Sequence, residues 1–128
     1  MRLLLDTHAF LWWLAGEAAL TRKARMTIAA EDTEVFVSAV SAWEIATKFR
    51  LGKLPEAAPV ATDIAAAVAA EGFSELALSL AHAARAGSLS GQHRDPFDRM
   101  LIAQAMLDDF TLVSNERAFD MYGVKRLW

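Results

Sequence analysis

Four acidic residues that stand far apart in this sequence each follow an apolar run or open the segment after one. They are Asp6, Glu44, Asp98 and Glu116. In an open parallel sheet the ligand crevice lies beyond the carboxyl ends of the strands, so acids at such positions can converge although they are distant in sequence. Converging carboxylates repel one another, and a hard divalent cation with oxygen ligands is the usual remedy. The four positions therefore predict a metal site at one edge of a sheet.

Each acid also has a local explanation, because acids are common in the first turns of helices. Ser41 and Glu44 have the spacing of a capping box, in which Glu44 folds back onto the backbone N–H of Ser41. Asp95 is suited to cap a helix whose first turn contains Asp98, and Glu116 can begin a short helix. Taken one at a time, these acids are explained better by capping than by metal binding.

Capping explains Asp6 less well than the other acids. Asp6 follows three leucines directly, and Thr7 can cap the next helix at a lower electrostatic cost. A carboxylate at the end of a buried strand needs a partner. The nearest basic residue, Arg2, stands four positions away on the same strand. Taken together, the four acids favour an ion-binding cluster.

The apolar pattern predicts alternating strands and helices. Short apolar runs bounded by turn residues predict buried strands, and apolar residues three or four apart predict helices. We expect strands at 3–5, 35–38, 73–78, 111–113 and 124–128, and helices at 10–14, 21–30, 43–49, 59–71, 79–86, 95–108 and 117–119. This alternation predicts an α/β fold, a three-layer α/β/α sandwich with a mainly parallel sheet of four or five strands.

The composition fits a single domain over residues 1–128, because roughly 65–70% of the unfolded surface is buried at that length. Lys and Arg number 13 against 16 Asp and Glu, so the net charge of −3 gives the molecule no overall basic field to attract nucleic acid. The absence of cysteine excludes a disulfide framework and a thiolate metal site. No apolar run is long enough to span a membrane, and we expect a cytoplasmic protein. The hydrophobic content of 55% indicates that a second copy or a partner covers part of the surface.

Four segments occur in the order found in PIN-domain proteins: 3–8, 38–45, 93–105 and 112–116. Within them, the His-Arg-Asp-Pro-Phe-Asp-Arg segment 93–99 is more specific than any single acid. The chain resembles the VapC-type toxins of bacterial toxin–antitoxin pairs from end to end. The resemblance implies a PIN-like fold and Mg²⁺- or Mn²⁺-dependent hydrolysis of RNA, with tRNA or another structured RNA as substrate. It also implies a homodimer and a cognate antitoxin as protein partners.

The resemblance also implies which residues form the catalytic and metal-binding site. Asp6, Glu44 and Asp98 match the three main acids of the family. Glu116 matches the fourth position, where the family usually has Asp, and its extra methylene leaves direct metal ligation open. We expect Asp6 and Asp98 to be the principal ligands, with Glu44 as a ligand or as a group that orients one and acts as a base.

Three further residues stand beside these acids and are candidates for support. Thr7 and Ser114 can hydrogen-bond the neighbouring carboxylates, although a hydroxyl at a helix start is more often a cap. Asp95 is expected first as a helix cap and second as an outer neighbour of the metal site.

RNA that approaches an acidic site needs compensating cations. The candidates for contact with its phosphates are Lys48, Arg94, Arg99 and Arg117. The alternative is that these are ordinary solvated charges. Arg99 directly follows Asp98, so it can pair with that acid or bind phosphate.

Four aromatic residues invite the idea of base stacking, but core packing is the simpler expectation for Trp43 and Phe49. Trp12 and Trp13 are neighbours on one helix and point about 100° apart. Both cannot face the same core, so we expect one of them at an interface.

Three other functions fit parts of the pattern. A phosphotransfer receiver domain shares the length and the acid after the first strand, but it needs an Asp after the third strand, where Ser79 stands. A haloacid-dehalogenase-like phosphatase needs an Asp two residues after Asp6, where His8 stands. A catalytically weak or silent PIN-like module that only binds an antitoxin stays open, because Glu116 departs from the expected Asp.

Overall fold

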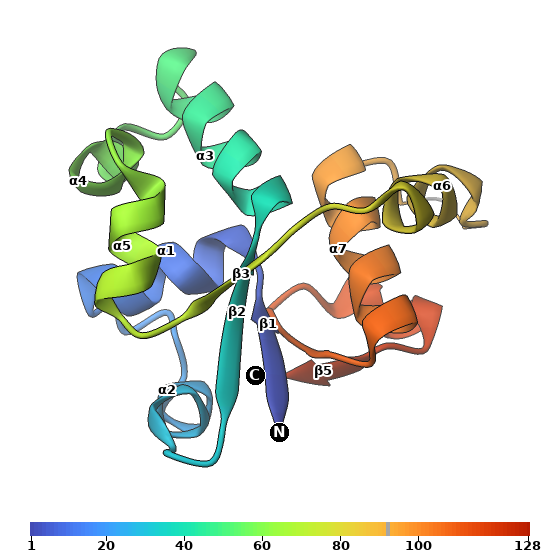
Figure 1. Ribbon diagram of the computed structural model, residues 1–128, viewed down its shortest axis with the longest axis horizontal. Coiled ribbons are helices and arrows are strands. Elements are labelled where there is room, and N and C mark those ends of the chain that lie inside the picture. Colours follow the sequence, from blue (N-terminus) through green and yellow to red (C-terminus); the bar gives the residue numbers. More distant parts are fainter. Residues whose placement is uncertain (92) are drawn as a thin grey trace.

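The computed structural model describes residues 1–91 and 93–128 of the chain. Its centre is a five-stranded sheet in the order β3-β2-β1-β4-β5, in which all neighbouring strands are parallel (Figure 1). The strands are β1 (Arg2–Leu5), β2 (Glu34–Ser38), β3 (Ser74–Leu76), β4 (Thr111–Val113) and β5 (Lys125–Leu127). The expected α/β fold with a parallel sheet is confirmed.

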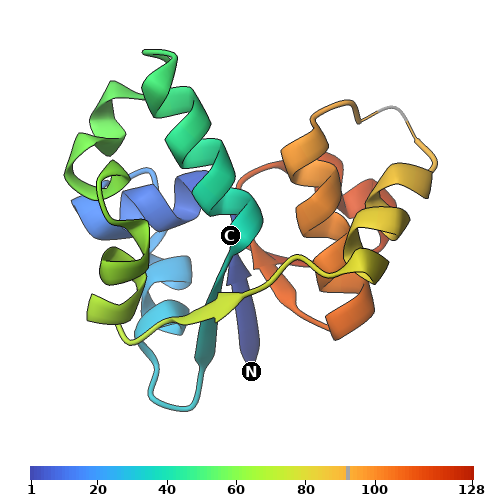
Figure 2. The same cartoon turned by 45° about the horizontal axis from the view of Figure 1, so that its top comes forward.

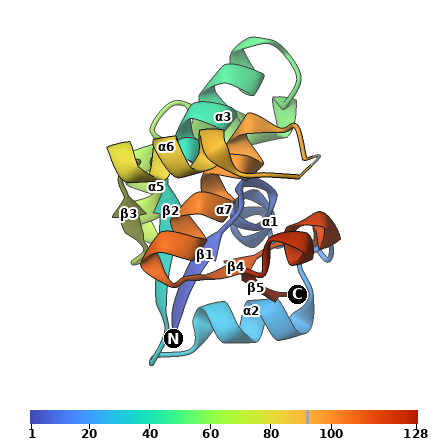
Figure 3. The same ribbon diagram turned by 90° about the vertical axis from the view of Figure 1, so that its right-hand side faces the viewer.

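Helices cover both faces of this sheet. The α-helices are α1 (Thr7–Ala15), α2 (Arg22–Ala29), α3 (Ala39–Arg50), α4 (Ala58–Ala61), α5 (Ile64–Ala70), α6 (Leu80–Ser88) and α7 (Pro96–Asp108), and two short 3₁₀ segments are η1 (Pro55–Ala57) and η2 (Arg117–Tyr122). Figure 1 shows α1, α2, α4 and α5 on one side of the sheet and α6 and α7 on the other, and Figure 3 views the molecule from the α6 and α7 side. Of the helices in the described part of the chain, none is long and apolar enough to cross a membrane.

The central strand β1 separates two apolar cores. Leu3 and Leu5 belong to the core under α1 and α2, whereas Leu4 belongs to the core under α7. Successive side chains of a strand point to opposite faces, so a strand buried on both faces needs an uninterrupted apolar run. All three leucines are fully buried. This explains why the sequence has a continuous run of leucines here.

The register of the three central strands brings their carboxyl ends level. Leu5 of β1 pairs with Val37 of β2 on one side and with Val113 of β4 on the other. The residues that follow these strands therefore begin at the same edge of the sheet, which is turned toward the viewer in Figure 2. Asp6 stands at this edge and donates its backbone N–H to the carbonyl of Val113 at 3.1 Å.

The helix expected over 59–71 is two helices, α4 and α5, with a break between them. Asp63 stands at the break and accepts a 3.0 Å hydrogen bond from the backbone N–H of Ala66. An Asp side chain that bonds a nearby backbone N–H competes with continuation of the helix. The expectation of one continuous helix was wrong for this reason.

The expectation that Trp43 and Phe49 lie in the core was also wrong. Trp43 is 57% exposed and Phe49 is 37% exposed. Helix α3 packs on the sheet only near its start and then projects past the edge, as Figure 2 shows. The Trp43 ring has Phe97 as a neighbour, with the ring centroids 5.1 Å apart. It is part of the surface rather than of either core.

Trp12 and Trp13 are both half-buried and take different partners. The ring centroids of Trp12 and Trp128 are 5.8 Å apart, and those of Trp13 and Phe73 are 5.9 Å apart. Both tryptophans pack against the border of the core under α1. Both rings thus have packing partners within the chain, and the expectation that one of them lies at an interface stays a prediction.

Candidate active site

A cavity of about 190 Å³ lies at the carboxyl edge of the sheet. We call it the acid cavity, and it is lined by Asp6, Thr7, His8, Glu44, Lys48, Asp95, Asp98, Asn115 and Glu116. The structure therefore places all four acids singled out in the sequence around one space. Asp95, Thr7 and Lys48 line the same space, and the candidate Ser114 is buried next to Asn115.

Asp6 is held by the first turn of α1. Its Oδ1 accepts a 2.8 Å hydrogen bond from the backbone N–H of Ala9, so Asp6 is itself the cap of α1. The argument that capping explains Asp6 less well than the other acids was therefore wrong. The side chain is buried, and burial raises the pKa of the Asp6 carboxyl, against the effect of a hydrogen bond from Ser114. Ser114 Oγ also accepts from the backbone N–H of Glu116 at 2.9 Å, and its support of the Asp6 carboxyl stays a prediction.

Glu44 lies inside α3 and is 4% exposed. The helix begins at Ala39 and is capped by Ser38, whose Oγ accepts from the backbone N–H of Val40 at 3.0 Å. The proposed capping box between Ser41 and Glu44 was therefore wrong, because Glu44 stands beyond the first turn. Its carboxylate faces the acid cavity instead.

Both carboxylate oxygens of Glu44 have close partners. Thr7 Oγ1 donates to Oε1 at 2.5 Å, and Lys48 Nζ donates to Oε2 at 2.5 Å. Thr7 Oγ1 also lies 3.0 Å from Ser41 Oγ. A hydroxyl has a single proton, so Thr7 donates to the carboxylate and accepts from Ser41. Thr7 is thus a buried support for Glu44, as the sequence suggested for a hydroxyl beside the acids.

Asp98 stands in the first turn of α7. The helix is capped by Asp95, whose Oδ1 accepts from the backbone N–H of Phe97 at 2.9 Å and from that of Asp98 at 3.3 Å. The expected capping role of Asp95 is confirmed. The Asp98 carboxyl has its pKa raised to about 6, mainly because burial disfavours its charged form.

His93 is a partner of Asp98 that sequence reasoning missed. Its Nε2 lies 2.9 Å from Oδ2 of Asp98. The two residues are five positions apart across the start of α7, where Pro96 turns the chain into the helix. The dense segment 93–99 was visible in the sequence, but no spacing rule for His before a helix start pointed to this contact.

Glu116 lies at the exposed rim of the acid cavity. Its Oε1 accepts a 3.1 Å hydrogen bond from the backbone N–H of Ala118 and caps η2. Its own backbone N–H donates to Ser114 Oγ at 2.9 Å. Glu116 is therefore the most exposed of the four acids and is already engaged as a helix cap.

The acid cavity has the donor chemistry of a hard divalent cation, because its acids supply only carboxylate oxygens. Within residues 1–91 and 93–128, however, no three His, Cys, Asp or Glu side chains lie close enough together to hold a metal ion. Glu44 is held by Thr7 and Lys48, and Asp98 faces His93. The donor set fits Mg²⁺ or Mn²⁺, and in this structure Glu44 and Asp98 are engaged by groups of the chain itself.

The four basic candidates for RNA contact have different surroundings. Lys48 lines the acid cavity, and Arg94 and Arg117 are exposed. The guanidinium of Arg99 donates to the backbone carbonyls of Ala86, Leu89 and His93. Arg99 therefore ties the segment before α7 to that helix. Of its two predicted roles, pairing with Asp98 was wrong, and binding of phosphate stays a prediction.

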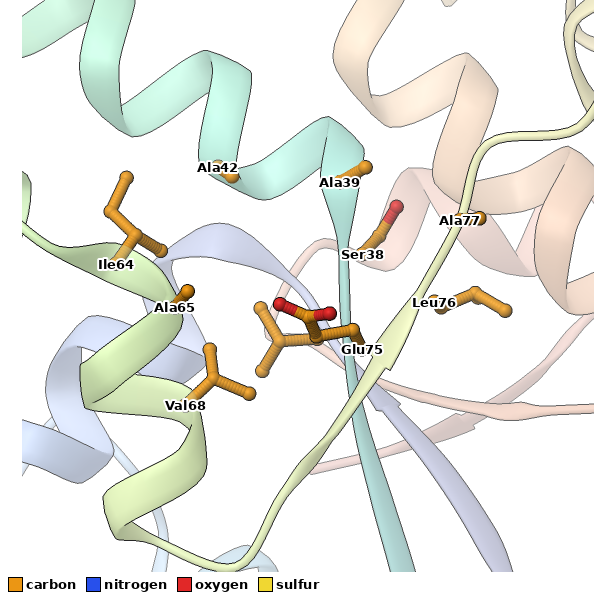
Figure 4. Close-up of a pocket in the computed structure, with 10 residues that line it drawn as sticks. Ser38, Ala39, Ala42, Ile64, Ala65, Val68, Glu75, Leu76 and Ala77 are labelled. Atoms are coloured by element: carbon orange, nitrogen blue, oxygen red, sulfur yellow. The ribbon is translucent and has the colours of Figure 1, made fainter.

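A larger hollow of about 410 Å³ lies on the opposite side of α3, between α5 and β3 (Figure 4). Its wall consists mainly of small apolar side chains, such as Ala39, Ala42 and Ala65. Glu75 is its single carboxylate and points from β3 toward α5 in Figure 4. This apolar hollow is lined by none of the four candidate catalytic acids, all of which line the acid cavity.

Residues 3–125 match the family model of the PIN domain. The chain belongs to the PIN-domain family. This PIN domain is similar in structure to a chain of VapBC2 from Rickettsia felis bound to a DNA fragment from its promoter (TM-score 0.71, 15% identity, covering 99% of this chain and 98% of that chain). It is also similar to Mycobacterium tuberculosis VapC20, a sarcin-ricin loop cleaving toxin (TM-score 0.64, 15% identity, 95% of each chain).

A third similar structure is a toxin–antitoxin complex from Klebsiella pneumoniae (TM-score 0.56, 16% identity, covering 88% of this chain and 85% of that chain). At such identities the likeness of the PIN domain to these structures shows a shared fold. No curated protein matches the sequence of the chain.

Proposed function

We propose that this PIN domain is a Mg²⁺- or Mn²⁺-dependent ribonuclease that acts as the VapC-type toxin of a toxin–antitoxin pair in the cytoplasm. The observation that carries the proposal is the acid cavity, where four acids from distant parts of a PIN-family chain line one space. A receiver domain or a dehalogenase-like phosphatase uses a different arrangement of acids, and membership of the PIN family argues against both.

In the proposed site, Asp6 and Asp98 would hold the cation, with Glu44 as a ligand or as the group that orients one. Glu116 would take part from the rim, directly or through water. A bound cation would lower the pKa of a water and neutralise charge that develops on the phosphodiester. The deprotonated forms of Asp6 and Asp98 are needed for ligation, although burial raises the pKa of both carboxyls.

The protein's own cations would then position the RNA. Lys48 points into the acid cavity, and exposed Arg94 and Arg117 follow the segments that carry His93 and Glu116. Cations at these places would offset the repulsion between RNA phosphates and the acids. The substrate class is structured RNA such as tRNA, and the resemblance to VapC20 in fold is consistent with a toxin that cuts a structured RNA loop.

The proposed protein partners are a cognate antitoxin and a second copy of the chain. Similar folds occur in toxin–antitoxin complexes. The exposed apolar side chains of Trp43 and Phe49, six positions apart on α3, offer surface for such a contact. The apolar hollow between α3, α5 and β3 offers more.

A catalytically silent antitoxin-binding module is the second candidate. It is favoured by one observation, that no metal-holding group of three ligands is assembled in the described part of the chain. One measurement distinguishes the two candidate functions: the purified chain cleaves RNA if it is a nuclease and does not if it is a silent module.

The deciding experiment incubates the purified chain with bulk tRNA and ribosomal RNA, with Mg²⁺, Mn²⁺ or EDTA. We expect cleavage that EDTA abolishes and that Asp6→Asn and Asp98→Asn lower by at least about 100-fold. Glu31→Gln is the matched control, because Glu31 is exposed and precedes β2 at the opposite edge of the sheet. Cleavage that survives EDTA, or that both Asn variants retain while folded, contradicts the nuclease proposal.

A further inference from the structure

The carboxylate of Glu44 is occupied on both oxygens by groups of this chain. Thr7 Oγ1 is 2.5 Å from Oε1, and Lys48 Nζ is 2.5 Å from Oε2. A cation that binds Glu44 through either oxygen has to replace one of these contacts or share the oxygen with it. The structure therefore raises the question of which contact gives way.

The Lys48 contact is the exchangeable one. The Lys48 side chain is 32% exposed, so its ammonium can turn into solvent without losing hydration. Thr7 is 3% exposed and its hydroxyl is also hydrogen-bonded to Ser41, so it cannot turn into solvent when it loses Glu44. The contact of Oε2 with Lys48 is thus the one that a cation can replace at low cost.

The charges around the acid cavity give Lys48 a role beyond this single ion pair. Five carboxyl groups line the space, those of Asp6, Glu44, Asp95, Asp98 and Glu116. Of the described residues that line it, Lys48 is the only Lys or Arg. Carboxylates that line one cavity repel unless a cation lies among them.

We propose that the Lys48 ammonium is the resident cation of the acid cavity, and that a divalent cation binds by exchanging with it at Glu44. Lys48 then sets the metal affinity by competition, and the released ammonium faces the same space, where it can contact an RNA phosphate. This inference rests on the proposed function, since it names how the metal site of the nuclease is assembled.

The test measures Mn²⁺ binding by isothermal titration calorimetry on the purified chain without RNA. Lys48→Met removes the ammonium, whose Nζ lies 5.7 Å from the centroid of the Phe97 ring, and keeps an unbranched apolar side chain. We expect Lys48→Met to bind Mn²⁺ about tenfold or more tightly than the wild type, because a competing charge next to a ligand is removed. Lys48→Arg keeps the charge and should stay close to the wild type.

Two controls assign the effect to the acid cavity. Lys53→Met removes one exposed positive charge that does not line the cavity, and it should change the Mn²⁺ affinity by less than about twofold because solvent and salt screen it. Asp98→Asn in the Lys48→Met background should abolish the gain in affinity. A gain that survives Asp98→Asn places the ion elsewhere and overturns the inference.

The remaining outcomes also decide. Equal affinities of Lys48→Met and Lys53→Met overturn the competition, and so does the absence of Mn²⁺ binding by both the wild type and Lys48→Met. Binding by Lys48→Met alone supports it strongly. If Lys48→Met does not fold, the same comparison is made with Lys48→Gln. NMR of the wild-type chain gives a second measurement, in which Mg²⁺ should move the Nζ signal of Lys48 toward that of Lys53. An Nζ signal that does not move at saturating Mg²⁺ overturns the exchange.

Failure of this inference is distinguishable from failure of the proposed function. A wild-type chain that cleaves RNA with Mn²⁺ but whose Lys48→Met variant binds Mn²⁺ no more tightly is a nuclease without the Lys48 competition. A chain that shows the gain in Mn²⁺ affinity but cleaves no RNA has the competition and lacks the proposed activity.

Discussion

The hydroxyl of Ser38 donates a 2.7 Å hydrogen bond to Oε1 of Gln104 and joins the start of α3 to the middle of α7. Both side chains are buried, and Gln104 Nε2 reaches the carbonyl of Ala77 at 3.3 Å. Helix α3 carries Glu44 and α7 carries Asp98, so this pair fixes the two site helices relative to each other. A buried, fully bonded polar pair of this kind favours one packing arrangement over its alternatives.

Gln104→Leu tests that role. The apolar side chain leaves the Ser38 hydroxyl and the Ala77 carbonyl without this partner, which should lower the free energy of unfolding by about 1–3 kcal/mol. Urea denaturation measures the loss, and a double-mutant cycle with Ser38→Ala should show a coupling of at least about 0.5 kcal/mol. Strictly additive losses would show that the two helices are positioned by other contacts.

Arg99 gives a second prediction, because its guanidinium holds the carbonyls of Ala86, Leu89 and His93. Arg99→Ala should lower the free energy of unfolding by about 1–3 kcal/mol, since three carbonyls lose a charged donor. It should also speed amide hydrogen exchange at 86–91. Arg94→Ala, at an exposed neighbouring position, is the control and should leave both quantities almost unchanged. An effect of Arg94→Ala as large as that of Arg99→Ala would show that the hydrogen bonds from Arg99 to these carbonyls are not what stabilises the segment.

The sheet and the acid edge were predictable from the sequence because they depend on local pattern. The three leucines of β1 must be buried on both faces, and strand ends in a parallel sheet meet at one edge. Asp95 as a cap of α7 was predictable for the same reason, since an acid before Pro96 is a local signal.

The errors arose where several local signals compete or where a long-range contact decides. Ser38 and Ser41 are both suitable caps for α3, and only the pairing of Ser38 with Leu76 of β3 shows that the strand continues to Ser38. The exposure of Trp43 depends on how far α3 projects past the sheet. The role of Arg99 depends on three carbonyls whose positions are set by the packing of α6 on α7. No sequence spacing encodes these distances.

Glu44 and Lys48 should respond unequally to mutation. Glu44→Gln keeps an oxygen that accepts from Thr7, and the partly exposed Lys48 ammonium can be hydrated by solvent when it loses its ion pair. The free energy of unfolding should therefore change by less than about 1 kcal/mol. Lys48→Met leaves the buried carboxylate of Glu44 without its cation and should cost about 1–3 kcal/mol in EDTA. Thermal unfolding of both variants measures the difference.

Cleavage adds a second contrast for the same pair. Glu44→Gln should lower RNA cleavage by at least about 100-fold, because the amide replaces a charged ligand or base. Normal cleavage by a Glu44→Gln chain with unchanged melting temperature would remove Glu44 from the site and leave it a structural residue.

The pKa of Asp98 makes the stability of the metal-free chain depend on pH. Burial raises this pKa from 3.8 to about 6, so the folded state binds a proton that the unfolded state releases between these two values. The stabilising contribution of protonated Asp98 is therefore complete below about pH 4 and is lost as the pH rises through 6. The wild type should lose about 3 kcal/mol from this residue between those limits. Asp6 has a raised pKa for the same reason and adds a change of the same sign.

Asp98→Asn removes the Asp98 contribution, since an amide does not titrate and still offers Oδ1 or Nδ2 to His93. In EDTA the variant should be more stable than the wild type at pH 7 by about 2 kcal/mol, and its free energy of unfolding should vary less between pH 4 and 7. Urea denaturation at four pH values in this range measures both effects. A wild-type chain that gains stability steadily from pH 4 to 7, with Asp98→Asn parallel to it, would show that Asp98 is ionised at low pH in the folded state.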